Sequence, residues 1–186
     1  MENQRVRLSK ELLRNSLTEL LFEKSIHKIS VREICERAQI NRTTFYKYYG
    51  SQYDLLADME NQVLSEIEGY LTTRVNNIQY DLSILDQIVG FVGEHPELFQ
   101  ILFNNNIDPK FPQKLFDLPV IREILTDHLQ TMYGKESHEY VYSLIVNGGF
   151  NVIKDWINKE KRESPEEIAG ILKSTISRLL FDHAQQ

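Results

Sequence analysis

The sequence predicts an all-α fold of about nine helices. Along most of its 186 residues, apolar side chains recur every three or four positions, the spacing of a helix that buries one face. Serine, asparagine and proline residues stand where such helices would begin or break. No segment of useful length alternates apolar and polar residues as a half-buried strand does. The composition, 41% hydrophobic and 26% charged, is that of an ordinary globular protein and excludes a disordered or fibrous chain.

The first two helices are indicated by a leucine pattern and by a capping signal. Four leucines fall on one face of a helix expected over residues 9–24: Leu13, Leu17, Leu20 and Leu21. A short second helix opens at Ser30, because Ser30 and Glu33 have the spacing of a capping box. Their side chains can each accept a backbone N–H that has no partner at a helix start.

Two more helices follow before the chain reaches its middle. Asn41 is a favoured N-cap for a third helix over residues 42–49. Ser51 caps a fourth helix that extends to residue 70 or beyond, because no proline interrupts it. One side of the fourth helix is apolar and carries Leu55, Leu56, Met59, Val63 and Ile67.

Five further helices are expected over residues 83–92, 96–103, 120–132, 137–159 and 165–184, the first beginning at Asp81 or Ser83. Pro96 separates the first two of these, because proline disfavours helical geometry in the residue before it. Residues 104–109 are expected to form a loop, and Gly134 is expected to end the third helix. The last helix starts with Ser164 as N-cap, Pro165 in the first turn and Glu167 as the capping carboxylate.

Charge is distributed unevenly along the chain. Residues 1–56 hold ten Lys and Arg against seven Asp and Glu, a net charge of +3, and residues 57–186 hold eleven against twenty, a net charge of −9. A basic head on an acidic body indicates that only the head meets a polyanion. We therefore expect two domains, a head of residues 1–56 and a body of residues 57–186.

Within the head, residues 31–50 have the pattern of a helix-turn-helix. The apolar offsets of two short, steeply crossing helices are occupied by Ile34, Ala38, Ile40, Phe45 and Tyr48. Cys35 is the small residue where the two backbones approach. Gln39 opens the turn at a position where glycine is usual, because that position often has a positive φ. A residue other than glycine there costs about 1 kcal/mol.

The outer face of the third helix gathers hydrogen-bond donors and aromatic hydroxyls, from Arg42, Thr43, Thr44, Tyr46, Lys47 and Tyr48. Arginine can make two hydrogen bonds to guanine O6 and N7, and threonine can contact a thymine methyl group or a base edge. Tyrosine and lysine side chains can reach phosphate oxygens. Three ordinary core helices are the alternative, but core packing gives no reason for such an exposed cluster.

These residues resemble a known family. Residues 8–56 are similar to the DNA-binding head of the TetR family of bacterial repressors. The stretch SVREICERAQINRTTFYKYYGSQYDLL carries the family pattern: a capped helix, an apolar turn, then T-x-F/L-Y-x-aromatic-aromatic, a serine and D-L-L. The resemblance implies a helical homodimer whose paired third helices enter successive major grooves of a double-stranded DNA operator.

Carried over position by position, the resemblance implies a role for each matched residue. Arg42, Thr43 and Tyr46 would face the bases. The DNA backbone would be held by Ser30, Thr44, Lys47, Tyr48 and Gln52. Gln52 replaces a lysine that usually neutralises a phosphate in the family. The loss of that charge should flatten the salt dependence of binding by about one unit per subunit.

The body is expected to join two subunits and to hold a ligand. Gly148 and Gly149 fall inside a helix, where they indicate close helix approach at a dimer seam or room beside a ligand. The expected dimer interface is a four-helix bundle formed by one face of the last two helices, with burial inside one subunit as the alternative. That face comprises Gly149, Ile153, Trp156, Ile168, Ile171, Leu172, Thr175, Ile176 and Leu179. A ligand pocket could lie among Phe91, Phe103, Tyr133 and Tyr142, with core packing as the alternative.

The expected function is that of a sequence-specific transcriptional regulator, a repressor released by a small-molecule effector. The tract NGGFNVIKDWINKEKRESPEEIAGIL resembles bodies common in family members from Firmicutes. Some similar proteins act with a partner protein instead of a small ligand, and one such coactivator works with the dihydroxyacetone kinase system. The alternative is therefore a coactivator whose body binds a protein.

Other classes find no support in the sequence. No paired carboxylate, nucleophile–base pair or phosphate-binding glycine loop indicates an enzyme. The five histidines are scattered, so no metal or other cofactor is expected. Apolar runs are far shorter than the roughly 20 residues that cross a bilayer, and the N-terminus has no signal-peptide core. Together with the single cysteine, Cys35, this indicates a cytoplasmic protein without a membrane partner.

Overall fold

The structure is a computed structural model that describes residues 4–74, 82–103 and 107–181. These residues form nine α-helices and one short 3-10 helix and contain no strand, so the all-α prediction is confirmed. They divide into two compact units, one built mainly from residues up to 63 and the other from residues 64–103 and 110 onward. Each unit is described by itself.

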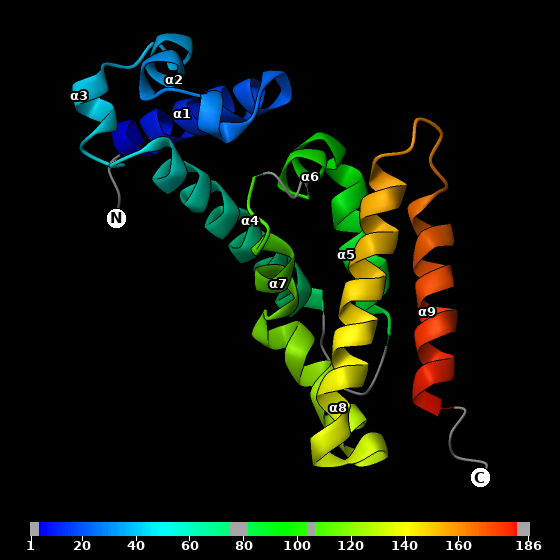
Figure 1. Cartoon of the computed structure of the whole chain (residues 1–186). Helices are drawn as coiled ribbons and strands as arrows, with labels where there is room; N and C mark the ends of the chain where they lie inside the picture. The colour runs from blue at the N-terminus through cyan, green and yellow to red at the C-terminus, as the bar shows by residue number, and fades with distance from the viewer. Residues whose placement is uncertain (1–3, 75–81, 104–106, 182–186) are drawn as a thin grey trace. The chain divides into compact units, whose positions relative to one another are not determined.

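The first unit contains α1 (Gln4–Glu23), the 3-10 helix η1 (Ile26–Lys28), α2 (Val31–Ala38), α3 (Arg42–Phe45) and the beginning of α4 (Gln52–Arg74) (Figure 1). The four leucines expected on the inner face of α1 are all buried. Helix α1 begins five residues before the predicted start at Ser9. None of the added residues 4–8 has a buried side chain, so they do not extend the apolar face of the helix.

The capping signals of the first unit are confirmed. The Ser30 hydroxyl accepts the Glu33 N–H at 3.3 Å, and the Glu33 carboxylate accepts the Ser30 N–H at 2.9 Å. Asn41 Oδ1 accepts the Thr43 N–H at 2.9 Å, and Ser51 Oγ accepts the Asp54 N–H at 3.3 Å. Side chains therefore define the starts of α2, α3 and α4.

The second unit contains the end of α4 followed by α5 (Ile84–Glu94), α6 (Pro96–Leu102), α7 (Phe111–Phe116), α8 (Pro119–Ile157) and α9 (Pro165–Phe181). Helices α5, α8 and α9 are in mutual contact, and α6 and α7 pack on α8. Helix α7 was not predicted, because it is short and contains a proline at its second position. Asp81, one of two predicted starts for α5, lies outside the described residues.

Helix α8 is two helices joined at a kink. Gly134 has a φ of 75° and a ψ of 167°, far from helical values, so the predicted break at this glycine is confirmed. The start of α9 also follows the prediction: the Ser164 N–H donates to the Glu167 carboxylate at 2.8 Å, and the Glu167 N–H donates to Ser164 Oγ at 3.2 Å.

Aromatic rings form much of the core of the second unit. Phe103 meets Phe99, Phe111 and Phe150 with ring centroids 5.2, 6.3 and 5.0 Å away. Phe116 in turn meets Phe150 edge-on at 6.4 Å. These contacts fasten α6 and α7 to the second half of α8.

Candidate nucleic-acid interface

Helix α3 is a single helical turn prolonged by further turns through Tyr48. Its regular part covers only Arg42–Phe45, against the predicted 42–49, but the backbone bonds from Lys47 N–H to Thr44 O and from Tyr48 N–H to Phe45 O continue the same coil. The outer side chains of Arg42, Thr43, Tyr46 and Lys47 are exposed, and 59% of Tyr46 is accessible. Thr44 and Tyr48 are half-buried.

The opposite side of this segment is anchored in the core of the head. Phe45 has 0% and Tyr49 5% exposed surface, and their rings lie 5.6 Å apart. The Tyr49 hydroxyl donates to Asp58 at 2.7 Å, and Arg14 binds the same carboxylate oxygen at 2.9 Å. Burial, followed by the bond to Asp58, raises the pKa of Tyr49. The exposed face is therefore held on a rigid base that joins α1 to α4.

The turn before α3 has the backbone geometry that the sequence predicts. Gln39 is left-handed, with φ 55° and ψ 38°, and no other non-glycine residue in the described chain has a positive φ. Cys35 and Ala38 are buried beside it. Burial raises the pKa of the Cys35 thiol, which fits a packing residue and not a reactive thiolate.

The predicted phosphate-binding residues have different surroundings. Lys47 is exposed, and Gln52 is half-buried in the first turn of α4. Ser30 is exposed, but its N–H and its hydroxyl both donate to the Glu33 carboxylate, at 2.9 and 2.8 Å. That carboxylate already occupies the anion position at the start of α2.

Two contacts beside these residues were not predicted. The Lys10 ammonium lies 5.9 Å from the centre of the Tyr48 ring, and His27 Nδ1 lies 2.9 Å from the Tyr53 hydroxyl. Each contact joins segments that are distant in sequence, so no local pattern signals it. Both add polar groups next to the predicted residues Tyr48 and Gln52.

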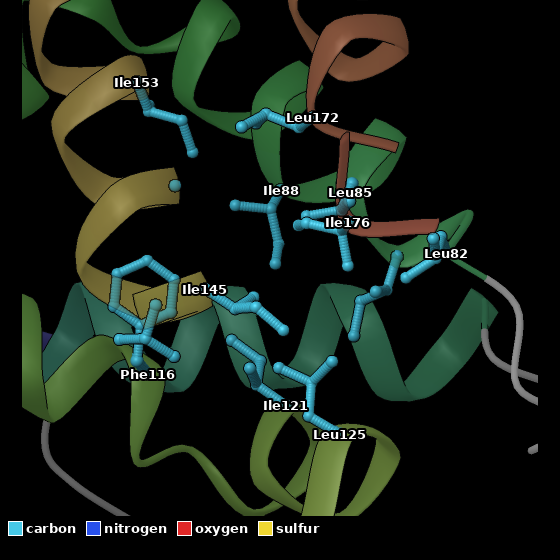
Figure 2. Close-up of a pocket in the computed structure, with 13 residues that line it drawn as sticks. Leu82, Leu85, Ile88, Phe116, Ile121, Leu125, Ile145, Ile153, Leu172 and Ile176 are labelled. Atoms are coloured by element: carbon cyan, nitrogen blue, oxygen red, sulfur yellow. The ribbon is translucent and has the colours of Figure 1, made fainter. Parts of the chain in front are cut away.

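The second unit holds an apolar cavity between α5, α8 and α9 (Figure 2). It contains about 520 Å³ of space not filled by atoms, part of which is open to solvent. All thirteen lining residues are apolar. Figure 2 shows Ile88, Ile121, Ile145, Ile153, Leu172 and Ile176 converging on this space from the surrounding helices.

The four aromatic residues predicted to line a pocket lie elsewhere. Phe91 and Phe103 are buried in the aromatic core. The Tyr142 hydroxyl donates to the Phe116 carbonyl at 2.7 Å, and the Tyr133 hydroxyl donates to the Leu179 carbonyl. The cavity is lined mainly by leucine and isoleucine, which no sequence pattern distinguishes from ordinary core residues. Of the predicted functional residues, the cavity includes Gly149, Ile153, Leu172 and Ile176.

Most of the residues predicted to join two subunits are covered by their own chain. Ile153, Trp156, Ile168, Leu172 and Ile176 are buried, so burial inside one subunit is the interpretation that holds for these five. Ile171 and Thr175 are exposed, and Gly149 and Leu179 are half-buried. A helical period identifies an apolar face but does not say which chain covers it.

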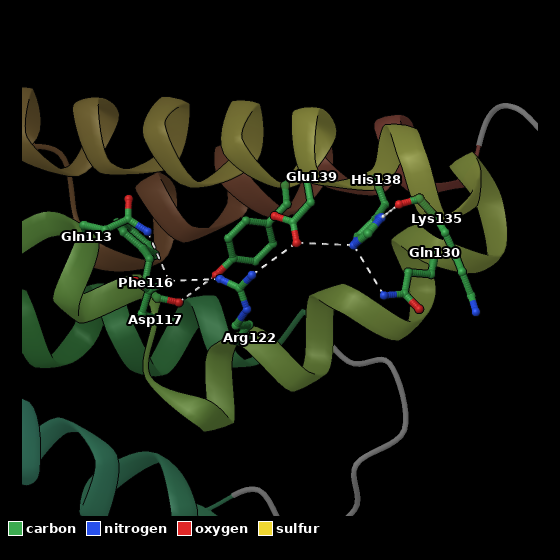
Figure 3. Close-up of polar contacts among 9 residues, drawn as sticks. Gln113, Phe116, Asp117, Arg122, Gln130, Lys135, His138 and Glu139 are labelled. Carbon is green, nitrogen blue, oxygen red and sulfur yellow. Dashed lines mark hydrogen bonds and ion pairs between the residues drawn. The ribbon is translucent and has the colours of Figure 1, made fainter.

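Polar contacts bridge the kink of α8 (Figure 3). Arg122 binds Asp117 at 3.0 Å and Glu139 at 3.2 Å. His138 is buried, and its Nδ1 lies 2.9 Å from the Lys135 carbonyl, which can only accept. Its Nε2 lies 3.3 Å from the Gln130 amide nitrogen and 3.4 Å from a Glu139 carboxylate oxygen. The contacts of Arg122 tie the first half of α8 to its neighbours.

Two other features are absent from the part of the chain that the structure describes. No three His, Cys, Asp or Glu side chains are grouped so that they could hold a metal ion. No helix among these residues is long and apolar enough to span a bilayer.

Solved structures share this fold. A TetR transcriptional regulator from Streptococcus agalactiae 2603V superimposes with a TM-score of 0.71 at 16% identity, over 93% of this chain and 96% of that one. The fatty acid degradation regulator FadR from Bacillus halodurans gives 0.70 at 13% identity, over 97% and 96%. The dihydroxyacetone kinase operon activator DhaS gives 0.60 at 18% identity, over 92% and 96%.

Sequence comparisons agree with the fold. The HTH-type transcriptional regulator YxbF of Bacillus subtilis (strain 168) is 24% identical over 180 residues, which are 91% of this chain and 45% of that protein. The chain thus spans less than half the length of this curated relative. A family model of the TetR-type bacterial regulatory proteins matches residues 15–59, and a model of a transcriptional regulator C-terminal region matches residues 81–178, more than half of the chain. With a helix-turn-helix in the first match and a helical body in the second, the protein belongs to the TetR family of DNA-binding transcriptional regulators.

Proposed function

We propose that the protein is a homodimeric repressor that binds a palindromic operator and releases it when a small molecule binds the body. The observation that carries this proposal is the exposed face of α3, where polar side chains project from a base fixed by Phe45 and Tyr49. In this proposal, residues 1–56 bind DNA in the cytoplasm, and residues 57–186 form the regulatory and dimerisation domain.

The exposed face supports a division between base-reading and backbone-binding residues. Arg42, Thr43 and Tyr46 read bases, since all three are exposed on and just after α3. The phosphates are held by Thr44, Lys47, Tyr48 and Gln52, with Lys10 supporting the Tyr48 ring. Ser30 contributes least to this group, because Glu33 already occupies its donors.

The dimer interface is proposed on the side of α8 and α9 that the protomer leaves uncovered. Large apolar side chains are exposed there: Tyr140, Leu144 and Val152 on α8 and Ile171 on α9. Thr175 lies one turn beyond Ile171 and is exposed as well. To enter successive major grooves, the two α3 helices of such a dimer would have to lie about 34–36 Å apart.

Selection from a random pool of DNA duplexes tests the operator proposal. The full chain is expected to enrich a two-fold symmetric sequence whose half-sites are one helical turn apart. Enrichment of asymmetric sequences, or of none, would contradict symmetric binding by two heads.

The alternative function is a coactivator whose body binds a partner protein, and the fold shared with the operon activator DhaS favours it. Gel filtration of the protein with cell extract separates the two functions. A stable hetero-complex that forms without effector supports the coactivator, and release of DNA by a small molecule supports the repressor.

A further inference from the structure

The cavity between α5, α8 and α9 has walls of one chemical kind. Leucine, isoleucine and valine side chains make up most of the lining, Phe116 is the one aromatic residue among the thirteen, and none of the thirteen is polar. A water molecule is stable in a cavity only with two or more polar partners, which these side chains do not provide. The space therefore suits hydrocarbon better than water.

Gly149 keeps part of this space open. It lies within α8 and lines the cavity, and a Cβ atom added to it would find no atom within 4 Å. Close packing of a neighbouring helix thus does not require glycine here. A longer side chain at position 149 would therefore extend into open space beside the cavity wall.

The opening of the cavity to solvent determines where a ligand can carry a polar group. Burying a hydroxyl or a charge without a hydrogen-bond partner is strongly unfavourable, and the lining offers none. Because the cavity is partly open to solvent, a polar group at one end of a ligand can stay hydrated while the rest is buried.

We propose that this cavity binds the hydrocarbon part of a molecule with a single polar end, which remains in water. The proposal names the effector class for the repressor described above and rests on that function only for its effect on DNA binding. Recognition comes from the shape and apolar character of the walls, with no specific polar contact inside.

A pair of matched probes tests the chemistry without any variant. 1-Decanol and 1,10-decanediol have the same chain length, but the diol must bury a second hydroxyl. Calorimetric titration of the full chain is expected to show one saturable 1-decanol site per chain and at least tenfold weaker binding of the diol. Shortening the alcohol should weaken binding by about fourfold per methylene. Equal affinities for the alcohol and the diol would overturn the proposal.

A pair of matched variants tests the location. In Gly149→Leu the new side chain fills the cavity, so the affinity for 1-decanol should fall at least tenfold. Gly69→Leu is the control, because Gly69 is an exposed glycine inside α4 that also has no atom within 4 Å of an added Cβ. Circular dichroism checks that both variants remain helical. Unchanged binding by folded Gly149→Leu would place the alcohol elsewhere and overturn the proposal.

The effect on DNA is measured separately, on the duplex selected from the random pool. Saturable 1-decanol binding that is lost in Gly149→Leu supports the site whether or not DNA is released. If the alcohol binds there and the affinity for DNA stays the same, the proposed release mechanism fails and the site stands. Absence of 1-decanol binding to the wild-type protein overturns the site and leaves the DNA-binding function untouched.

Discussion

Gln39 carries the most unusual backbone conformation in the head. Its left-handed φ of 55° lets the chain leave α2 and enter α3 within three residues, and its N–H still bonds to the carbonyls of Cys35 and Glu36. Glycine adopts this conformation without the contact between Cβ and backbone that a larger residue suffers. The steep crossing of α2 and α3 therefore exists in spite of the side chain at position 39.

Replacing Gln39 by glycine should stabilise the head. The Gln39 side chain is exposed, so its loss removes little packing, and the relief of strain is about 1 kcal/mol less the extra freedom that glycine gives the unfolded chain. We expect Gln39→Gly to raise the free energy of unfolding by up to about 1 kcal/mol. Urea denaturation of both proteins measures this change, and a loss of stability would contradict the prediction by showing that the freedom of glycine in the unfolded chain outweighs the relief at position 39.

Glu33 is a second residue of the head whose surroundings change a measurable property, the pKa of its carboxyl group. Its carboxylate accepts bonds from Lys24, from the Ser30 N–H and from the Ser30 hydroxyl, which together lower its pKa from 4.5 to about 2. A carboxyl group with a depressed pKa in the folded state stabilises the fold above its unfolded pKa. It loses that contribution as the pH falls through its folded pKa.

The stability difference between the wild type and Glu33→Gln should therefore depend on pH. It is expected to be full at and above about pH 5 and to shrink as the pH falls from 4.5 towards 2. Thermal unfolding of both proteins across this range makes the comparison, since the other carboxyl groups titrate in both. A difference that stays constant across the range would rule out the charged capping box as its source.

At the scale of helices, close approach and free volume distinguish two glycines of α5. A Cβ on Gly93 would lie 3.1 Å from both the Trp156 ring and the Pro165 ring, whereas a Cβ on Gly90 would find no atom within 4 Å. The indole of Trp156 is buried and donates to the Glu163 carbonyl at 2.9 Å, so it cannot easily move aside. The absence of a side chain at Gly93 therefore lets α5 pack closely against Trp156 and Pro165.

Alanine should stabilise the protein at position 90 but not at position 93. Gly90→Ala is expected to gain about 0.5–1 kcal/mol of stability from helix propensity alone. Gly93→Ala should lose that gain to the steric conflict and be no more stable than the wild type. Chemical denaturation compares the two variants. An equal gain in the free energy of unfolding for both would mean that Trp156 and Pro165 are loosely packed against α5.

Helix starts could be predicted because they are signalled by adjacent residues. The predicted hydrogen bonds are made by two capping pairs, Ser30 with Glu33 and Ser164 with Glu167, and by the single N-cap Asn41. The functional faces of α8 and α9 could not be assigned in the same way. Ile171 and Leu172 are adjacent in sequence, yet Ile171 is exposed and Leu172 lines the cavity, and only the packing of α5 decides between them.

The residues that line the cavity could not be predicted from the sequence for the same reason. Aromatic residues were the candidates for its lining, with core packing as the alternative, and Phe91 and Phe103 pack against other phenylalanines. The leucines and isoleucines that do line it come from several helices, and no local pattern relates them. The exposed side of the segment from Arg42 to Tyr48 could be predicted because the segment is continuous in sequence, whereas the contact of Lys10 with Tyr48 required the fold.

At the scale of the whole molecule, the proposed interface makes two heads act together. Leu144 on α8 is 61% exposed and Leu8 on α1 is 56% exposed. Because their exposure is similar and they belong to different units, Leu8 can serve as the control for a substitution at Leu144. Leu144→Glu places a charge in the proposed interface and should weaken dimerisation at least tenfold, because a buried charge without a partner is costly. Leu8→Glu should leave the dimer intact.

Sedimentation velocity over a range of protein concentrations measures both variants. If Leu144→Glu remains a dimer at the concentrations where the wild type does, the interface lies on another surface. In the proposed dimer, a ligand that favours one spacing of the heads would change the affinity for DNA, and DNA would change the affinity for the ligand by the same factor.

The segment from Arg42 to Tyr48 is proposed to read DNA. The most direct test is the affinity of wild type, Arg42→Ala and Lys47→Ala for the selected operator and for unrelated duplex at one salt concentration. Arg42→Ala should cost about 1–3 kcal/mol on the operator and relax the preference at one base pair, with little effect on unrelated DNA. Lys47→Ala should weaken binding to both duplexes alike. An equal loss on both duplexes for Arg42→Ala would contradict a base-reading role for this segment.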